Sequence, residues 1–242
     1  MSKPESIISD KISPPSHLPR ISRARLIKMI ENSTLAGTST IISGRAGTGK
    51  TTLALDFAEK CRRSVAWYKV DAPDADRRFF FNYLIRSIQQ ARPSFGALSL
   101  LSHIEIAGVE PVTWLAESLV YELAESESGG PLLIVIEDLH LVSDSDWLVP
   151  FLGRLLPLLP SQVHVLITSR SLPTTPLWRM RSKQSLVVID EAALAFTRAE
   201  ANELFESYGL SGDQAGIALD HTHGRAAALD ESAATLRSES PA

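Results

Sequence analysis

The sequence has a single cysteine, Cys61, so the chain cannot form an internal disulfide, and such a composition is typical of a reducing compartment. Its first fifteen residues contain no apolar segment of the kind that a secretion signal requires. No apolar run approaches the roughly 18 residues that would be needed to cross a bilayer. These absences predict a cytoplasmic protein without membrane contacts.

The sequence also has no strong excess of either charge. Its net charge is −4 over 242 residues, so the overall charge does not favour binding to polyanions. No internal repeat and no Ser–His–Asp or Cys–His arrangement stand out, and His221 and His223 are too few for a metal site. Since 44% of the residues are hydrophobic, the chain can bury an ordinary globular core.

Short apolar segments alternate with segments of helical periodicity along most of the chain. Residues 132–136 (LLIVI) form an unbroken apolar run, which is typical of a strand buried on both faces of a sheet. Strands are predicted at 38–43, 65–70, 132–136, 163–168 and 186–189, and helices at 22–31, 50–61, 75–90, from about 111, and at 144–157. Because helical connections separate the strands, we predict an α/β fold with a five-stranded parallel sheet flanked by helices.

The periodic pattern also predicts how the chain divides. Residues 1–19 contain four prolines and are expected to form a flexible or draped N-terminal arm, and residues 20–192 to form the α/β domain. Residues 193–237 read as a small lid of helices at 198–208, 212–222 and 225–237. Residues 238–242 are expected to be a disordered tail.

The segment 44–51 (GRAGTGKT) matches the phosphate-loop pattern G-x-x-x-x-G-K-[ST] between a predicted strand and a predicted helix. Glycines let the backbone N–H groups face a phosphate, and the helix N-terminus attracts anions. Lys50 adds a full positive charge, and the Thr51 hydroxyl is suited to ligate magnesium. We therefore predict ATP or ADP with Mg²⁺ as ligand, bound by Gly44, Ala46, Gly47, Thr48, Gly49, Lys50, Thr51 and Thr52.

Two acids follow the apolar run at 132–136. Glu137 and Asp138 fit the second element of a phosphate-loop enzyme, an acid that reaches the magnesium or its waters. Asp usually stands first, nearest the metal, whereas here Glu137 does. Either its extra methylene places a water between it and the metal, or Asp138 takes the metal role. Both are predicted as catalytic and metal-side residues.

Other polar residues follow the remaining strands. Arg170, at the end of the strand at 163–168, is predicted to sense the γ-phosphate or stabilise charge during transfer, the alternative being a surface arginine. Asp71, Asp74 and Asp76 follow the second strand, and we prefer helix capping by Asp74 or Asp76 to a metal site. His140 is interpreted as a neighbour of the acids rather than a base.

Taken in order, these motifs resemble the nucleotide-binding domain of STAND-class P-loop NTPases, which have an ASCE/AAA-like sheet. The resemblance is to the large LuxR-type ATP-dependent transcription regulators, typified by the maltotriose-responsive activator. The matching stretches are 22–26, 44–51, 67–71, 79–90, 132–140, 166–170, 194–205 and 223–229. They cover nearly the whole chain after residue 18.

The resemblance implies a regulatory switch. ADP would hold a closed state, an inducer would permit ATP exchange and self-association, and slow hydrolysis would reset the switch. Arg170 matches the arginine that reads the γ-phosphate, and the segment around Arg23 matches the part beside the adenine. The family usually has Asp-Asp in place of Glu137-Asp138 and Gly-Trp in place of Gly224-Arg225.

Two alternatives remain beside the switch. One is a nucleotide-binding module without hydrolysis, which the departure at Glu137 favours. The other is a P-loop small-molecule kinase, which would need an acceptor pocket and a catalytic lid rich in arginine. Arg179, Arg181 and Lys183 fit such a lid, although we prefer to interpret them as a solvated loop. The family's winged-helix, sensor and DNA-binding parts are not expected in these residues, so DNA would be contacted only through domains outside this chain.

Overall fold

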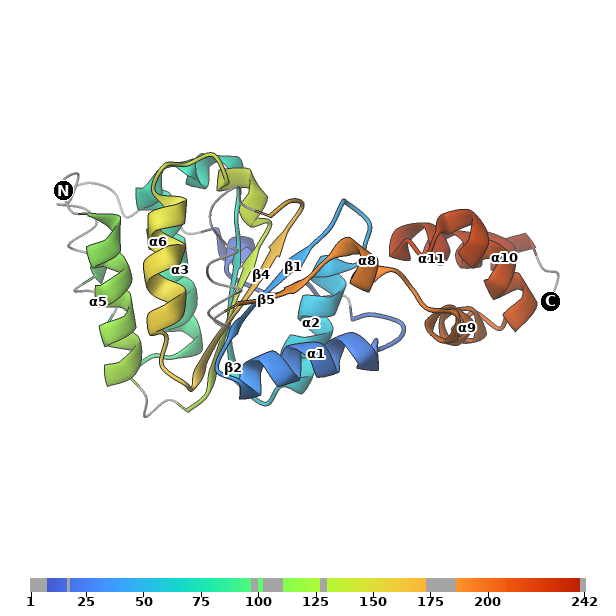
Figure 1. Ribbon diagram of the computed structural model, residues 1–242, viewed down its shortest axis with the longest axis horizontal. Helices are drawn as coiled ribbons and strands as arrows, with labels where there is room; N and C mark the ends of the chain where they lie inside the picture. Colours follow the sequence, from blue (N-terminus) through green and yellow to red (C-terminus); the bar gives the residue numbers. More distant parts are fainter. Residues whose placement is uncertain are drawn as a thin grey trace.

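The computed structural model describes residues 8–16, 18–96, 100–101, 111–126, 130–172 and 186–239. Its centre is one parallel sheet in the order β2-β3-β4-β1-β5 (Figure 1). The strands are β1 (Ser39–Ser43), β2 (Ser64–Lys69), β3 (Leu132–Glu137), β4 (Val163–Ser169) and β5 (Leu186–Ile189). The predicted five-stranded parallel sheet is therefore confirmed, with each strand within two residues of its expected bounds.

Helices cover both faces of the sheet (Figure 1). On one face lie α1 (Ala24–Leu35) and α2 (Lys50–Lys60), and on the other α3 (Arg77–Ala91), α5 (Val112–Glu125) and α6 (Leu148–Leu155). Side chains alternate along each strand, so Ile41 packs in the cluster with α3, α5 and α6 while Ile42 packs in the cluster with α1 and α2. Because both faces of the sheet are covered by helices, most strand residues are buried, which explains why the strands are apolar.

The parallel sheet gathers the ends of its strands at one edge. Ile42 of β1 pairs with Thr168 of β4, and Ile136 of β3 pairs with Ile167 of β4. The segments that follow β1, β3 and β4 therefore leave the sheet close together. In parallel α/β sheets this carboxyl edge is where ligands bind.

The C-terminal helices form a separate small unit at one end of the molecule (Figure 1). They are α9 (Arg198–Ser207), α10 (Gly212–Thr222) and α11 (Ala226–Glu239), joined to β5 through the short α8 (Glu191–Leu194). Capping boxes, Thr197 with Glu200 and Ser211 with Gln214, begin α9 and α10. The unit has its own apolar cluster, which also includes Ile21.

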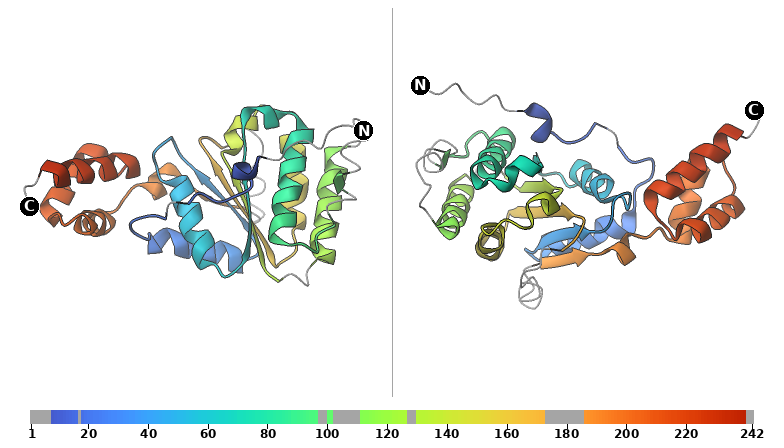
Figure 2. Two further views of the ribbon diagram at one scale, coloured as in Figure 1. Left: turned by 180° about the vertical axis from the view of Figure 1, so that it is seen from behind. Right: turned by 90° about the horizontal axis from the view of Figure 1, so that it is seen from above.

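The described part of the N-terminal arm crosses the surface beside α3 (Figure 2). It contains a 3₁₀ turn, Ser9–Lys11, and the buried Lys11 ammonium donates to Asp74 at 2.7 Å. Asp76 caps α3 by accepting from the Arg78 N–H, which confirms the capping interpretation. Within the described ranges no three His, Cys, Asp or Glu side chains form a metal-binding group.

The helix predicted at 144–157 is wrong at its start. A 3₁₀ turn, Leu139–Val142, comes first, and α6 begins only at Leu148. Pro150 lacks an N–H and fits only the first turn of a helix, so the helix begins just before it. The first helix is also displaced from its expected 22–31. Among the described helices, none combines the length and the apolar character needed to span a bilayer.

Candidate functional site

The loop between β1 and α2 has the backbone that a phosphate loop requires. Gly47 and Gly49 have φ of +79° and +85°, a left-handed conformation that glycine adopts without strain. A Cβ on Gly47 would lie 3.0 Å from the Cβ of Ala227, in the lid. The glycine is therefore needed both for the turn and for the approach of the lid.

Lys50 is the first residue of α2 and is only 7% exposed. Its ammonium donates to the carbonyl oxygen of Arg45 at 2.9 Å, and no ion pair joins it to a carboxylate in the part of the chain that the structure describes. Burial lowers the pKa of Lys50, and the charge of Asp138 opposes this shift. A buried cation without a bound anion is costly, so the position suits a phosphate.

Thr51 and Glu137, both expected on the metal side, are joined by a hydrogen bond. The Thr51 hydroxyl donates to Glu137 Oε1 at 2.6 Å, and Glu137 is 4% exposed. The other carboxylate oxygen accepts from the Trp67 indole N–H at 3.1 Å. A hydroxyl in the first turn of α2 and a carboxylate at the end of β3 are hard oxygen donors, so these residues fit Mg²⁺.

Asp138 leaves the strand in a left-handed conformation, with φ of +59°. Its backbone N–H donates to the Thr168 hydroxyl at 3.0 Å, and its carboxylate lies 3.8 Å from Nδ1 of His140. Burial lowers the pKa of His140, and Asp138 opposes that shift. The ends of β3 and β4 thus converge beside Lys50.

Arg170 is exposed and lies just after β4. Its charge contributes to lowering the pKa of Lys50, after the larger effects of burial and of Asp138. The charge of Arg170 also contributes to lowering the pKa of His140. The arginine therefore stands near the phosphate loop with its guanidinium accessible to a ligand.

The other predicted loop residues lie around the same turn. The Gly44 N–H donates to the Ser169 carbonyl at 3.2 Å, which joins the loop to β4. The Thr48 hydroxyl donates to the Arg45 carbonyl at 2.9 Å. Thr52 faces a cavity on the side of the loop nearer the lid.

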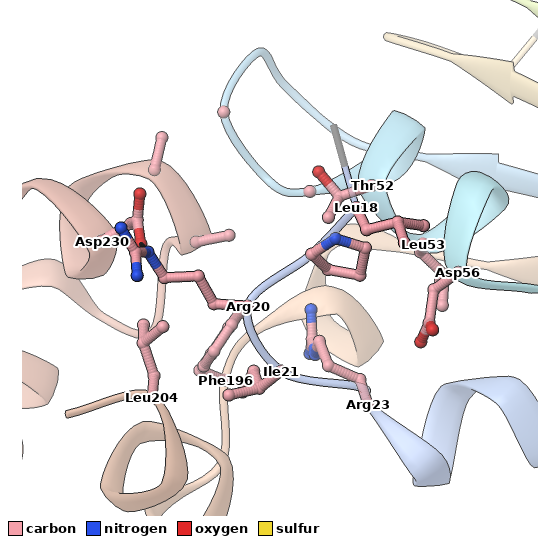
Figure 3. Close-up of a pocket in the computed structure, with 15 residues that line it drawn as sticks. Leu18, Arg20, Ile21, Arg23, Thr52, Leu53, Asp56, Phe196, Leu204 and Asp230 are labelled. Carbon is pink, nitrogen blue, oxygen red and sulfur yellow. Dashed lines mark ion pairs between the residues drawn. The ribbon is translucent and has the colours of Figure 1, made fainter. Parts of the chain in front are cut away.

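That cavity has a volume of about 410 Å³ (Figure 3). Its walls come from residues 18–23, from α2, from Phe196 and Leu204, and from the start of α11. Gly47 and Gly49 also line it, so the cavity opens directly onto the phosphate loop. A nucleotide whose phosphates lie on the loop would have space here for its base.

Arg23 lines this cavity and is 7% exposed. Its Nη2 donates to Glu200 at 3.3 Å and to the Ala195 carbonyl at 3.2 Å, and its guanidinium lies 4.3 Å from the ring centre of Phe196. Nε and Nη1 are buried without a hydrogen-bond partner in the structure. The predicted base-side arginine therefore stands at the cavity with two unsatisfied donors.

The lid contacts the phosphate loop itself. The Ala227 N–H donates to the Gly47 carbonyl at 2.9 Å, and Arg225 Nη2 donates to the Ala46 carbonyl at 2.7 Å. Arg45 forms an ion pair with Glu191 at 2.6 Å. The sequence did not predict these contacts: the departure at Gly224-Arg225 had put lid contacts in question, and the Arg45 and Trp67 contacts had no sequence signal.

The kinase interpretation depended on Arg179, Arg181 and Lys183. All three lie outside the described residues.

Comparison with known proteins identifies relatives in sequence. A family model for the AAA ATPase domain matches residues 22–168. The serine/threonine-protein kinases PknK of Mycobacterium tuberculosis and Mycobacterium bovis are 34% identical over 203 residues, which covers 81% of this chain. The match covers only 18% of those relatives, so this chain corresponds to a minor part of their length.

Solved structures agree in fold. The Walker-type ATPase paby2304 of Pyrococcus abyssi matches with a TM-score of 0.56 and 14% identity, over 90% of this chain and 68% of that one. The Aeropyrum pernix ORC1 protein in complex with DNA matches with a TM-score of 0.53 and 16% identity, over 92% and 61%. At such identities the likeness shows the fold alone. Since the family model spans more than half of the sequence, this chain belongs to the AAA ATPase domain family.

Proposed function

We propose that this AAA ATPase domain is a slowly hydrolysing ATP switch of a STAND/LuxR-type transcription regulator, acting in the cytoplasm. The observation that carries the proposal is the direct bonding of the lid to the phosphate loop, through Arg225 to Ala46 and through Ala227 to Gly47. Phosphates bound by the loop would compete with, or add to, these contacts. Nucleotide occupancy and lid position would therefore be thermodynamically linked.

The residues around the loop support a division of roles. Lys50 would neutralise the terminal phosphates, and Thr51 with Glu137 would hold Mg²⁺, which would neutralise further negative charge on the phosphates. The carboxylate of Asp138 lies 3.8 Å from His140, whereas that of Glu137 accepts two hydrogen bonds. Asp138 would orient the attacking water or accept a proton from it. Arg170 would read the γ-phosphate.

The wider roles follow from the same resemblance. ATP-dependent self-association would transmit the state of the switch, and DNA would be contacted only through domains outside this chain. The ORC1 structure named above contains DNA, but its likeness concerns the fold, so we propose no DNA contact for this domain.

The first test removes the loop cation. Lys50→Ala deletes the buried ammonium that would bind the phosphates, so the affinity for ATP should fall about ten- to a hundredfold, the range for a charged hydrogen bond. Isothermal titration calorimetry with ATP and magnesium measures this. Lys28→Ala, at an exposed position of α1, is the matched control. An unchanged affinity in Lys50→Ala would reject the assignment.

The second test separates binding from hydrolysis. Asp138→Asn keeps the shape of the side chain but removes the base, so phosphate release should slow about a hundredfold or more while ATP affinity changes little. Asp144→Asn, at an exposed position of the following loop, should behave as wild type. Turnover of Asp138→Asn at the wild-type rate would remove Asp138 from catalysis.

The same assay distinguishes the alternatives. Slow phosphate release with tight ADP retention supports the switch. Tight binding without any release indicates a nucleotide-binding module, and fast transfer to a small acceptor indicates a kinase.

A further inference from the structure

Trp67 is a buried tryptophan with a polar bond at the candidate magnesium site. It lies in the middle of β2 and is 1% exposed. Its indole N–H donates to Glu137 Oε2 at 3.1 Å, while the Thr51 hydroxyl donates to Glu137 Oε1 at 2.6 Å. Each carboxylate oxygen therefore has its own donor.

The sheet register produces this contact. Trp67 of β2 pairs with Val135 of β3, and Glu137 stands two residues beyond Val135. Because side chains alternate with a period of two, all three point to the face that α2 covers. Trp67 and Val135 pack in the apolar cluster of that face, beneath the first turn of α2 that carries Thr51.

An indole can orient the carboxylate but cannot replace it. Its nitrogen only donates a hydrogen bond, so Trp67 is no metal ligand. A glutamate has several rotatable torsions, and binding one of its oxygens restricts the direction of the other. Burial strengthens the effect, since an indole N–H at this depth would otherwise lack a partner.

We propose that Trp67 is a positioning residue that holds the Glu137 carboxylate in the orientation needed to bind magnesium beside Thr51. The inference rests on the proposed function, because it assigns Glu137 to the metal. It predicts that loss of the indole N–H weakens magnesium binding and leaves the affinity of the loop for the phosphates unchanged.

The variant that tests this is Trp67→Phe, which keeps an aromatic ring and deletes the N–H. Partners that orient metal ligands usually change metal affinity about ten- to a hundredfold when removed. We therefore expect Trp67→Phe to need about ten to a hundred times more magnesium to reach half-maximal enhancement of ATP binding. ATP affinity in EDTA should stay within about twofold of wild type.

Trp147→Phe is the matched control. The Trp147 indole N–H also donates to an oxygen, the Ala75 carbonyl, at 2.9 Å, and the side chain is also buried, but in the cluster on the opposite face of the sheet. Losing this bond should affect thermal stability and leave the magnesium requirement unchanged. An unaltered magnesium requirement in Trp67→Phe would overturn the proposal.

A double-mutant cycle tests the route through Glu137. If Trp67 acts on the metal only through this carboxylate, Trp67→Phe should add almost nothing to the magnesium defect of Glu137→Gln. Additive defects would contradict the positioning role. If the wild-type chain binds no ATP at all, the proposed function fails, whatever the variants do.

A spectroscopic measurement covers the case in which Trp67→Phe does not fold. In the otherwise wild-type chain, the indole N–H resonance of Trp67 should move when Glu137 is replaced by Gln, because a neutral acceptor takes the place of a charged one. It should also move when magnesium and ATP are added. The Trp147 resonance should stay in place, and a Trp67 resonance that responds to neither change would refute the contact.

Discussion

At the scale of single residues, buried polar side chains lie next to polar groups with which they can form hydrogen bonds. His164, in β4, is 3% exposed and lies 3.3 Å from the Thr40 hydroxyl, which in turn donates to Ser33 at 2.9 Å. Its ring also meets Phe57 edge-on, at 6.3 Å between ring centres. Burial lowers the pKa of His164 to about 4, so it is neutral at physiological pH.

This shift predicts an acid-sensitive fold. The histidine pKa is 6.5 in the unfolded reference and about 4 in the fold, so only the unfolded chain binds this proton between those values. The free energy of unfolding should therefore fall as the pH drops below 6.5, by ~2 kcal/mol from this group between pH 7 and pH 5. Urea unfolding at the two pH values measures the loss.

The control for this prediction is another histidine. His164→Gln should lose most of the pH dependence, although its stability at pH 7 will also change. His221→Gln, at an exposed position of α10, should keep the wild-type pH dependence. If all three chains lose stability equally on acidification, the source lies elsewhere.

At the scale of elements, local sequence patterns predicted most of the fold. The strands were recognisable because both faces of the sheet are covered, which demands the apolar runs that the sequence contains. The start of α6 was missed because residues 144–147 form turns ahead of the helix, as in the bond from the Ser145 N–H to the Val142 carbonyl at 3.1 Å.

The candidate site was predictable only in part. Lys50 and Thr51 belong to one contiguous motif, and Glu137 follows an obvious strand, so their meeting follows from the parallel sheet. The bond from Trp67 to Glu137 requires the register of β2 on β3, and the bond from Arg225 to Ala46 joins residues 179 positions apart. Periodicity carries no information on such contacts, because they depend on how whole elements are placed.

At the scale of the whole molecule, the lid and the sheet domain meet around the cavity, whose lining comes from both (Figure 3). Glu200, in the first turn of α9, accepts from both Arg23 and Arg25 at 3.3 and 3.4 Å. Burial lowers the pKa of Arg23, and the charge of Glu200 opposes this shift. The Arg23–Glu200 pair is therefore a buried charge contact between the two units, and its arginine also lines the cavity.

Weakening this pair should loosen the lid and hasten the release of bound nucleotide. Glu200→Gln removes the charge, yet glutamine still serves in the capping box with Thr197, so α9 should remain folded. If the loss of charge costs ~1.4 kcal/mol or more of lid docking, release of a fluorescent ADP analogue should quicken about tenfold or more. Stopped-flow displacement measures the rate. Glu203→Gln, exposed on the same helix, should release the analogue at the wild-type rate, whereas equal rates in all three chains would mean that the lid does not retain the nucleotide.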